Sequence, residues 1–530
     1  MTLRKNLMMA LAAGALLVSA AGGTRAEDAA PKVGGILRYA VSDDPANFDC
    51  HSANHFAALM RLAPHYSTLL RFKPGAYPEI EGDLAESWQA DPASLTYTFK
   101  IRPGVKFHDG TDLSAKDVAT TYERLTFPPD GVVSERLEAF RQIEKIEAVD
   151  DHTVRFKLKE WDTSVLGTFA SPWNCVYSAA LLASDPTYPK EKVMGSGPFV
   201  FSDFAAGSVW TSTKFDGYFR KGQPYLDGLE SYTMEGPAVV NAIQAGQIHT
   251  DFRGVSPAGA DRLKQSLGDK VAIESGPSLT HFLVTFNSEK PPFNDERVRR
   301  ALNLAIDRWG GAKGLGKTTE MRYAGGIFLP GGQFAATEEE LNKMPGFGTD
   351  IEAARAEARK LLKEAGQENL SFDLTVRNGP PIVVDFGIFL VDQWRQIGVN
   401  ARNVVVETPP WAAALSEGSF TAIVDIYSAL REEPTEQMTK YVSHDVSARS
   451  AGRFTDRELD KLWHDQALET DPAKRKALLR AFETRLYEKS YSLPVVWLER
   501  TVAMNAALKG WTFNPSNFLY LDQSSTWLDE

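Results

Sequence analysis

Two histidines near the amino end are spaced as metal ligands can be. His51 and His55 are four residues apart, so on a helix both imidazoles would lie on one face, as two ligands of one metal ion require. The intervening Ser52-Ala53-Asn54 is equally typical of a loop, and no second cluster of ligands completes a coordination shell. We expect local hydrogen bonding or a pocket wall here, and neither a metal nor a cofactor.

Gly311–Thr318 fits the P-loop pattern letter for letter. Phosphate binding also needs a buried strand before the loop and a helix that begins at its end, so that free amides surround the phosphate. Here an amphipathic helix predicted over 298–309 precedes the loop, and residues 321–326 have no helical pattern. We interpret the segment as a glycine-rich connection and not as a nucleotide site.

No combination of nucleophile and base indicates an enzyme. The sequence contains neither a Gly-x-Ser-x-Gly elbow nor His-Glu-x-x-His. His108-Asp109-Gly110 follows a predicted strand, where Asp-Gly is ordinary turn chemistry. A secreted hydrolase stays open as an alternative, but we name no catalytic residue.

The elements that must position these residues alternate between strands and helices. Thr96–Ile101 alternates polar and apolar residues, as a half-buried strand does. Ser114 fits a helix N-cap with Asp117 at the third helical position, and Asn294 can cap a second helix. Residues 371–399 read as strand, helix and the start of another strand. The chain is therefore predicted to be α/β.

Phe99–Leu125 closely resembles a family signature. In the extracellular solute-binding proteins of the dipeptide, oligopeptide and nickel uptake systems, a strand ending in Arg-x-Gly-Val-x-Phe-x-Asp-Gly leads into Ser/Thr-Ala-x-Asp-Val. Pro291–Arg308 is a second strong match to this family. Weaker matches in the expected order are 194–199, 218–229 and 245–248. The resemblance extends from about Gly34 to Trp511.

This resemblance implies an α/β, two-lobed periplasmic binding-protein fold of type II, with an extra domain inserted in lobe I. Residues 27–75, 196–280 and 496–530 would form lobe I, 76–195 the inserted domain, and 281–495 lobe II. A solute would be enclosed between the lobes, which close on it by hinge motion.

The amino end has the pattern of a secretory signal peptide. Arg4 and Lys5 precede an apolar run over 7–18, and Ala26 is the small residue that cleavage needs. The run is shorter than the ~20 residues of a spanning helix. No cysteine lies near the cleavage point, so we expect a free periplasmic protein without a lipid anchor.

Charge and cysteine content limit the partners. The 530 residues include 58 basic and 69 acidic ones, a net charge of −11. Removal of residues 1–26 takes away three basic residues and no acidic one, which gives −14. A chain this acidic does not fit nucleic acid or anionic lipid as a partner.

The two cysteines leave one question open. Cys50 and Cys175 either form a disulfide or stay free, and the sequence does not decide between the two.

One loop indicates whether the solute is a peptide. In peptide-binding relatives a strand leads through Gly-Trp-x-x-Asp to an acidic residue and Pro, and this Asp pairs with the peptide ammonium. Counted back from Pro434, Tyr427 takes the Trp position and Leu430 the Asp position. An ammonium buried without its carboxylate would cost several kcal/mol. We therefore favour an organic acid, a sugar-containing or another non-peptide solute; a shifted alignment would offer Glu432 or Glu433 instead.

The same resemblance selects the residues expected at the ligand. The loop after the first strand and the segment around Trp173 should face the cleft, Trp173 and Trp411 are candidates for stacking, and Arg431 suits an anionic group. The full set is Ser52, Asn54, His55, Trp173, Trp411, Tyr427, Ser428 and Arg431.

The function implied is that of a non-catalytic, monomeric receptor. It would capture a small solute in the periplasm and deliver it to the permease and ATPase subunits of an ABC importer. The alternatives are di- or oligopeptide transport and a chemosensory receptor subunit of the same fold.

Overall fold

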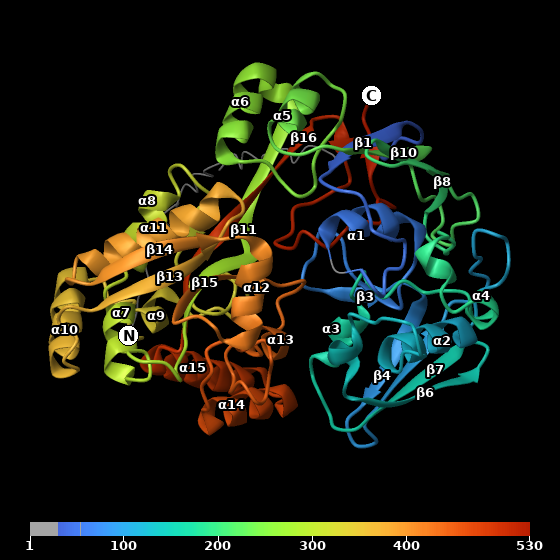
Figure 1. Cartoon of the computed structure of the whole chain (residues 1–530). Coiled ribbons are helices and arrows are strands. Elements are labelled where there is room, and N and C mark those ends of the chain that lie inside the picture. Colours follow the sequence, from blue (N-terminus) through green and yellow to red (C-terminus); the bar gives the residue numbers. More distant parts are fainter. Residues whose placement is uncertain (1–29, 54) are drawn as a thin grey trace, which may run out of the picture.

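Two lobes connected by a pair of long strands make up the structure (Figure 1). The computed structural model describes residues 30–53 and 55–530. The connecting strands, β11 (Val271–Phe286) and β16 (Ser492–Asn505), pair antiparallel. The mixed α/β, two-lobed architecture agrees with the prediction, whereas the predicted signal peptide, residues 1–26, lies outside the described residues. No helix in the described part of the chain is long and apolar enough to cross a lipid bilayer.

The first lobe contains two separate four-stranded sheets. One has the order β1-β10-β9-β8, in which only β1 and β10 are parallel, and the other is antiparallel with the order β4-β5-β7-β6. The strands of this lobe are β1 (Ile36–Val41), β2 (Leu70–Phe72), β3 (Ile80–Gly82), β4 (Ala85–Asp91), β5 (Thr96–Ile101), β6 (Ile143–Asp150), β7 (Thr153–Leu158), β8 (Phe199–Ala205), β9 (Val209–Lys214), β10 (Gly228–Thr233), β17 (Leu508–Lys509) and β18 (Trp527–Leu528). Its helices are α1 (Phe56–Leu62), α2 (Ala115–Thr126), α3 (Val165–Phe169), α4 (Ala179–Ser184), α5 (Pro237–Gln244) and α6 (Pro257–Leu267).

Helix α2 packs on β6 and β7, and its start was predicted correctly. The Ser114 backbone N–H donates to Asp117 Oδ2 at 2.8 Å, which satisfies an amide at the helix start. Tyr122 on the buried face packs with its ring centroid 5.2 Å from that of Phe156 and 5.4 Å from that of Phe169. The signature segment is thus a structural unit that holds this sheet together.

The second lobe is built on a six-stranded sheet with the order β12-β16-β11-β15-β13-β14. Strand β13 is parallel to β14 and β15, as the predicted β-α-β pattern requires. Its further strands are β12 (Met321–Tyr323), β13 (Ser371–Arg377), β14 (Asn400–Val406) and β15 (Ala422–Ser428). Its helices are α7 (Glu296–Leu304), α8 (Arg308–Leu315), α9 (Glu338–Leu341), α10 (Ile351–Glu364), α11 (Pro381–Arg395), α12 (Thr408–Glu417), α13 (Pro434–Met438), α14 (Arg457–Leu468) and α15 (Pro472–Lys489).

The helix predicted over 298–309 is two helices. Helix α7 begins after Asp295, whose carboxylate accepts a backbone N–H at 2.9 Å, so the predicted cap Asn294 is wrong by one residue. Asp307 caps α8 in the same way at 2.8 Å, which starts a new helix where one continuous helix was expected. Gly311–Thr318 is consequently helical over its first half and not a connection, and strand β12 follows it.

The ladder between β11 and β16 is irregular where the strands pass from one lobe to the other. Val271–Pro277 pairs with one half of β16, and the register then shifts before pairing resumes at His281. Proline has no N–H to donate to a ladder, so Pro277 weakens the pairing at this point. We infer that the lobes bend relative to each other here.

A disulfide joins Cys50 to Cys175 within the first lobe. Both cysteines are fully buried, and 125 positions separate them in the sequence. The bond ties the loop before α1 to the segment between α3 and α4. The question that the sequence left open is therefore decided in favour of a bonded pair.

We expect the double substitution Cys50→Ser/Cys175→Ser to lower the free energy of unfolding by about 2–5 kcal/mol, since the crosslink restricts a long loop in the unfolded chain. Urea denaturation with and without reductant measures this. The reductant should lower the midpoint of the unaltered protein and leave that of the double variant unchanged. Equal midpoints for oxidised and reduced protein would contradict a stabilising role.

Candidate functional site

Arg431, in the loop after β15, binds across the boundary between the lobes. Its Nη1 donates to the Ser164 carbonyl at 3.0 Å and its Nη2 to Thr168 Oγ1 at 2.8 Å. Its Nε lies 3.4 Å from the Glu436 carboxylate. Gly167, in α3, allows this close approach, because a Cβ there would fall 2.1 Å from Nη1 of Arg431. The guanidinium predicted to face a ligand thus fastens the second lobe to the first.

The backbone on both sides of Arg431 is fastened as well. The Glu432 N–H donates to Tyr77 Oη at 2.7 Å, and Ser516 Oγ donates to the Leu430 carbonyl at 2.6 Å. Tyr77 and Ser516 both belong to the first lobe. We call this region, Tyr77, Ser164–Thr168 and Ser516 against Leu430–Glu432, the seam; the lobes are closed along it.

The positions that could bind a peptide ammonium are apolar or already engaged. Leu430 packs in an apolar cluster with Trp173. Glu433 forms an ion pair with Arg475 at 2.6 Å. Glu432 accepts a backbone N–H from Phe334 at 3.4 Å, and burial raises its pKa to about 7. The alternative anchors therefore have partners within the second lobe.

Arg136 is a basic side chain beside the seam that the sequence analysis missed. Its guanidinium lies 4.8 Å from the centroid of the Trp173 ring, and its Nη2 donates to the Ala53 carbonyl at 2.6 Å. Its buried Nε has no hydrogen-bond partner, and burial lowers its pKa to about 10. Within residues 30–53 and 55–530 it forms no ion pair. A half-buried cation is thus left without a direct ion pair, although the negative charges of Glu135 and Glu436 act on it.

In the second lobe a second arginine, Arg449, lies near the ring of Tyr427, but its side chain is exposed. The Arg449 guanidinium lies 5.8 Å from the centroid of the Tyr427 ring, and it too lacks an ion pair with any described residue. Tyr427 is buried, its hydroxyl has no hydrogen-bond partner, and burial raises its pKa. The amide of buried Gln437, on α13, is also unpartnered in the described structure. Such groups are places where a solute or water completes the hydrogen bonding.

The charge of Glu436 acts on one residue of each arginine-aromatic pair. Its negative charge works against the lowering of the Arg136 pKa and adds to the rise of the Tyr427 pKa, so it lies near both side chains. One pair comes from each lobe. The charge of Glu436 therefore acts on Arg136 of the first lobe and on Tyr427 of the second, while its carboxylate lies 3.4 Å from Nε of Arg431.

The structure brings together only part of the predicted set. Trp173, Tyr427 and Arg431 lie at or beside the seam. Ser428 follows Tyr427 and shares a hydrogen bond with Thr280 at 3.0 Å. Trp411, by contrast, donates its Nε1 to the Val424 carbonyl at 3.0 Å and packs within the second lobe.

The predicted site residues Ser52 and His55 have local structural roles just before α1. Ser52 Oγ donates to the Asp49 carbonyl at 3.3 Å, and His55 occupies the N-cap position of α1. Asn54 lies outside the described residues. His51 is buried against the Cys175 carbonyl at 3.0 Å, and burial lowers its pKa to about 3. His51 lies before the helix, so the two histidines do not share a helical face.

The comparisons with known proteins agree with this architecture. The sequence model described as "Bacterial extracellular solute-binding proteins, family 5 Middle" matches residues 79–448. The chain is 27% identical to Heme-binding protein A of Haemophilus influenzae, over 86% of this chain and 85% of that protein. It is 29% identical to the glutathione-binding protein GsiB of Pectobacterium atrosepticum, over 80% of this chain and 86% of that protein.

A solved structure shows the same fold. The ABC transporter-associated periplasmic binding protein DppA from Helicobacter pylori, in complex with the peptide STSA, superposes with a TM-score of 0.77 at 21% identity, covering 94% of this chain and 99% of that one. These relatives are named as binding proteins. The family match spans well over half of the sequence, and the chain belongs to the bacterial extracellular solute-binding proteins of family 5.

Proposed function

We propose that this protein is the periplasmic receptor of an ABC importer and that it encloses a carboxylate-bearing solute between its lobes. The observation that carries the proposal is the pair Arg136 and Arg449, one from each lobe, each placed over an aromatic ring and without an ion pair among the described residues. In this proposal residues 1–26 are the signal peptide. The mature monomer releases its solute to the permease and ATPase subunits.

The proposal follows from the charge of these two guanidinium groups, of which Arg136 is half-buried and Arg449 is exposed. A guanidinium removed from water without a counter-ion is unfavourable, and a carboxylate of the solute would restore the lost interaction through charge-assisted hydrogen bonds. The Arg136 guanidinium lies over the Trp173 ring and the Arg449 guanidinium over the Tyr427 ring, and a guanidinium suits bidentate contact with a planar carboxylate. Two arginines that form no ion pair among the described residues, one in each lobe, therefore support an anionic solute.

The class of solute is inferred from the groups in the second-lobe loop that could pair with an ammonium. Leu430 is apolar, and Glu432 and Glu433 are engaged, so no carboxylate in this loop is free for an ammonium. This supports an organic acid or an acidic, peptide-like compound whose amine stays in water. Heme and glutathione, for which two relatives are named, each carry two carboxylates.

Peptide transport is the second candidate. It is supported by the solved DppA structure, which was determined with the peptide STSA. It differs from the first proposal in one testable respect, since a peptide receptor recognises the free amino terminus.

A chemosensory receptor subunit would share the solute site with a transport protein. Permease and ATPase genes beside this gene would indicate transport, so the gene neighbourhood separates the two functions.

Loss of one arginine should weaken the binding of carboxylates selectively. We expect Arg136→Gln and Arg449→Gln each to cost about 1.5–3 kcal/mol, tenfold or more in affinity, because each removes a charged hydrogen-bond donor. The measurement is calorimetric titration of refolded, ligand-free protein with glutathione and with its diamide. Arg155→Gln, an exposed arginine on β7, is the matched control. Unchanged affinity in both variants would refute the arginine site.

Blocking the amine of an acidic peptide should have little effect. We expect triglutamate and N-acetyl-triglutamate to bind within about twofold of each other, because Leu430 offers the ammonium no charge. Thermal-shift and calorimetric titrations of the refolded protein measure both. A tenfold loss on acetylation would instead support peptide transport and place the amine at Glu432 or Glu433.

Opening the seam should weaken the binding of all solutes by a similar factor. We expect Arg431→Ala to enlarge the radius of gyration in X-ray scattering and to lower affinity about tenfold for glutathione and triglutamate alike, since it destabilises the closed form. Gly167→Ala is an independent variant, because its Cβ displaces the same guanidinium while alanine suits helix α3. If both variants keep the radius and affinity of the unaltered protein, the seam does not control closure.

A further inference from the structure

The lobes also meet beside the seam, where a segment of the first lobe after β7 lies against α14 of the second. Glu160 Oε1 lies 3.4 Å from His464 Nε2. Thr163 donates its backbone N–H and its hydroxyl to the Ala467 carbonyl, at 3.1 and 3.0 Å. Asp162 lies between these two contacts and is buried. Its carboxyl group is therefore placed at the boundary that opens and closes.

Asp162 has no counter-ion among the described residues. Its Oδ1 accepts the Ser164 N–H at 2.8 Å. Burial raises the pKa of Asp162 above its ordinary value, and hydrogen bonds from Ser164 oppose the rise. The second lobe adds two charges, of which Glu433 raises the pKa more than Arg431 lowers it. The charge that arrives with the second lobe thus disfavours the ionised carboxylate.

Glu432 is the buried carboxyl on the other side of the seam. Its backbone N–H donates to Tyr77 Oη of the first lobe, and its charge acts on that hydroxyl. Its side chain accepts the Phe334 N–H at 3.4 Å and lies so close to Gly332 that a Cβ there would fall 2.1 Å from Oε1. It too forms no ion pair within the described part of the chain. Burial raises its pKa to about 7, and the charge of Glu433 adds to the rise.

The cations near these two carboxyls already have other partners. Arg475 pairs with Glu433 at 2.6 Å, and Arg431 lies 3.4 Å from Glu436. The titratable and charged groups that face the two carboxyls come from both lobes: Tyr77, Tyr97, Arg431, Glu433, His464 and Arg475. Closing the lobes thus buries two carboxyls without pairing either of them with a cation.

Opening the lobes reverses this effect. Asp162 then loses its cover by α14 and the charge of Glu433, and Glu432 loses its cover by Tyr77, so both pKa values fall towards those of ordinary carboxyl groups. The closed form consequently binds more protons, and a state that binds more protons is favoured as the pH falls. The gain for closure is complete at about pH 4, and it is lost as the pH rises through about 7, the value for Glu432.

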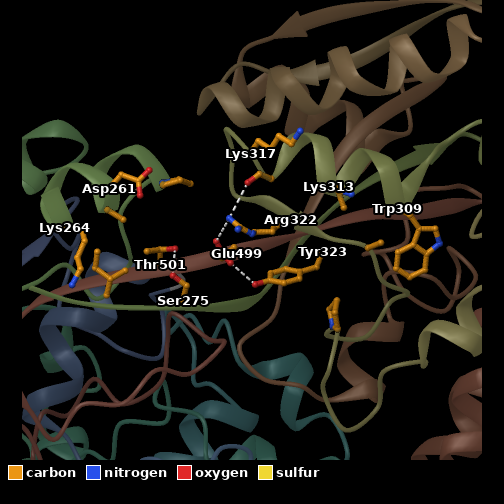
Figure 2. A pocket seen from close by; sticks show the side chains of 17 residues that line it. Asp261, Lys264, Ser275, Trp309, Lys313, Lys317, Arg322, Tyr323, Glu499 and Thr501 are labelled. Carbon is orange, nitrogen blue, oxygen red and sulfur yellow. Dashed lines mark hydrogen bonds and ion pairs between the residues drawn. The ribbon is translucent and has the colours of Figure 1, made fainter. Parts of the chain in front are cut away.

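A groove along the connecting strands leaves the lobes free to make this movement. It has a volume of about 1200 Å³ and lies along β11 and β16 (Figure 2). Asp261 and Lys264 on α6 form the first-lobe wall, and Lys313 and Lys317 lie on the wall at α8. Among the described residues no hydrogen bond or ion pair joins α6 to α8 or β12. The groove therefore contains no bond between its walls that would have to break when the seam opens.

We propose that Asp162 and Glu432 make closure of the lobes dependent on pH: both take up protons when the seam closes, so capture of the solute strengthens as the pH falls and release is favoured as it rises. The dependence of capture rests on the proposed function. The dependence of closure is a property of this chain alone and can be measured without a solute.

X-ray scattering of the ligand-free full chain at about pH 7.5 and about pH 5.5 tests closure, since these values lie on either side of the Glu432 pKa. We expect the radius of gyration of the unaltered protein to be smaller at the lower pH. The variant Asp162→Asn/Glu432→Gln should have the smaller radius at both, because its amides keep the acceptor oxygens and carry no charge. Each single substitution should give an intermediate dependence. Equal radii of the unaltered protein, or a double variant that keeps the pH dependence, overturn the proposal.

Two controls separate these carboxyls from other titrating groups. Asp392→Asn with Glu417→Gln, exposed carboxyls on α11 and α12, should keep the dependence. His464→Gln should keep it too, although histidine titrates in this pH range. Loss of the dependence in the exposed pair would show a general effect of charge, and its loss in His464→Gln would assign it to the contact with Glu160; either result overturns the proposal.

Calorimetric titration with glutathione tests the coupling to capture, because its carboxylates stay ionised over this range. We expect affinity to be higher by about threefold or more at about pH 5.5 than at about pH 7.5, and nearly equal for the double variant. Equal affinities for the unaltered protein would overturn the coupling. Absence of glutathione binding at both pH values would contradict the proposed solute and leave the closure result standing, so the two failures are distinguishable.

Discussion

The whole molecule depends on one antiparallel pair of strands that must be continuous and still bend. The half of β11 and β16 in the first lobe is held rigidly, because buried Arg500 donates to the carbonyls of Phe252, Asn514 and Ser516. The other half is packed into the second lobe, where the His281 and Trp497 rings lie 4.3 Å apart. We therefore infer that the lobes bend at the short irregular stretch between these two anchored halves.

The seam shows that closure is supported by contacts of the protein with itself. Arg431 and the backbone around it are hydrogen-bonded to residues of the first lobe. In the proposed function a solute supplies the remaining difference between the open and closed states through Arg136 and Arg449. Arg431 thus joins the lobes, whereas the arginines proposed to bind the solute are Arg136 and Arg449.

The fold was largely predictable, whereas the site was predictable only in part. Motifs such as Ser114 with Asp117 are local, so one sequence window contains the whole interaction. The break before α8 was missed because Asp307 looks like an ordinary helix residue until its cap is seen. Arg136 and Arg449 leave no spacing signal, since each is defined by an aromatic ring from another part of the chain. Arg431 was found, but its partners Ser164 and Thr168 are visible only after folding.

The disulfide has a consequence for where the protein can work. The Ala53 carbonyl that orients Arg136 lies three residues after Cys50, in the loop that the Cys50–Cys175 bond holds in place. In a reducing cytoplasm such bonds do not persist. A newly made chain would then lack the support behind its arginine until it reached an oxidising compartment. The protein would then become able to bind its solute only after export. It would therefore not sequester that solute inside the cell.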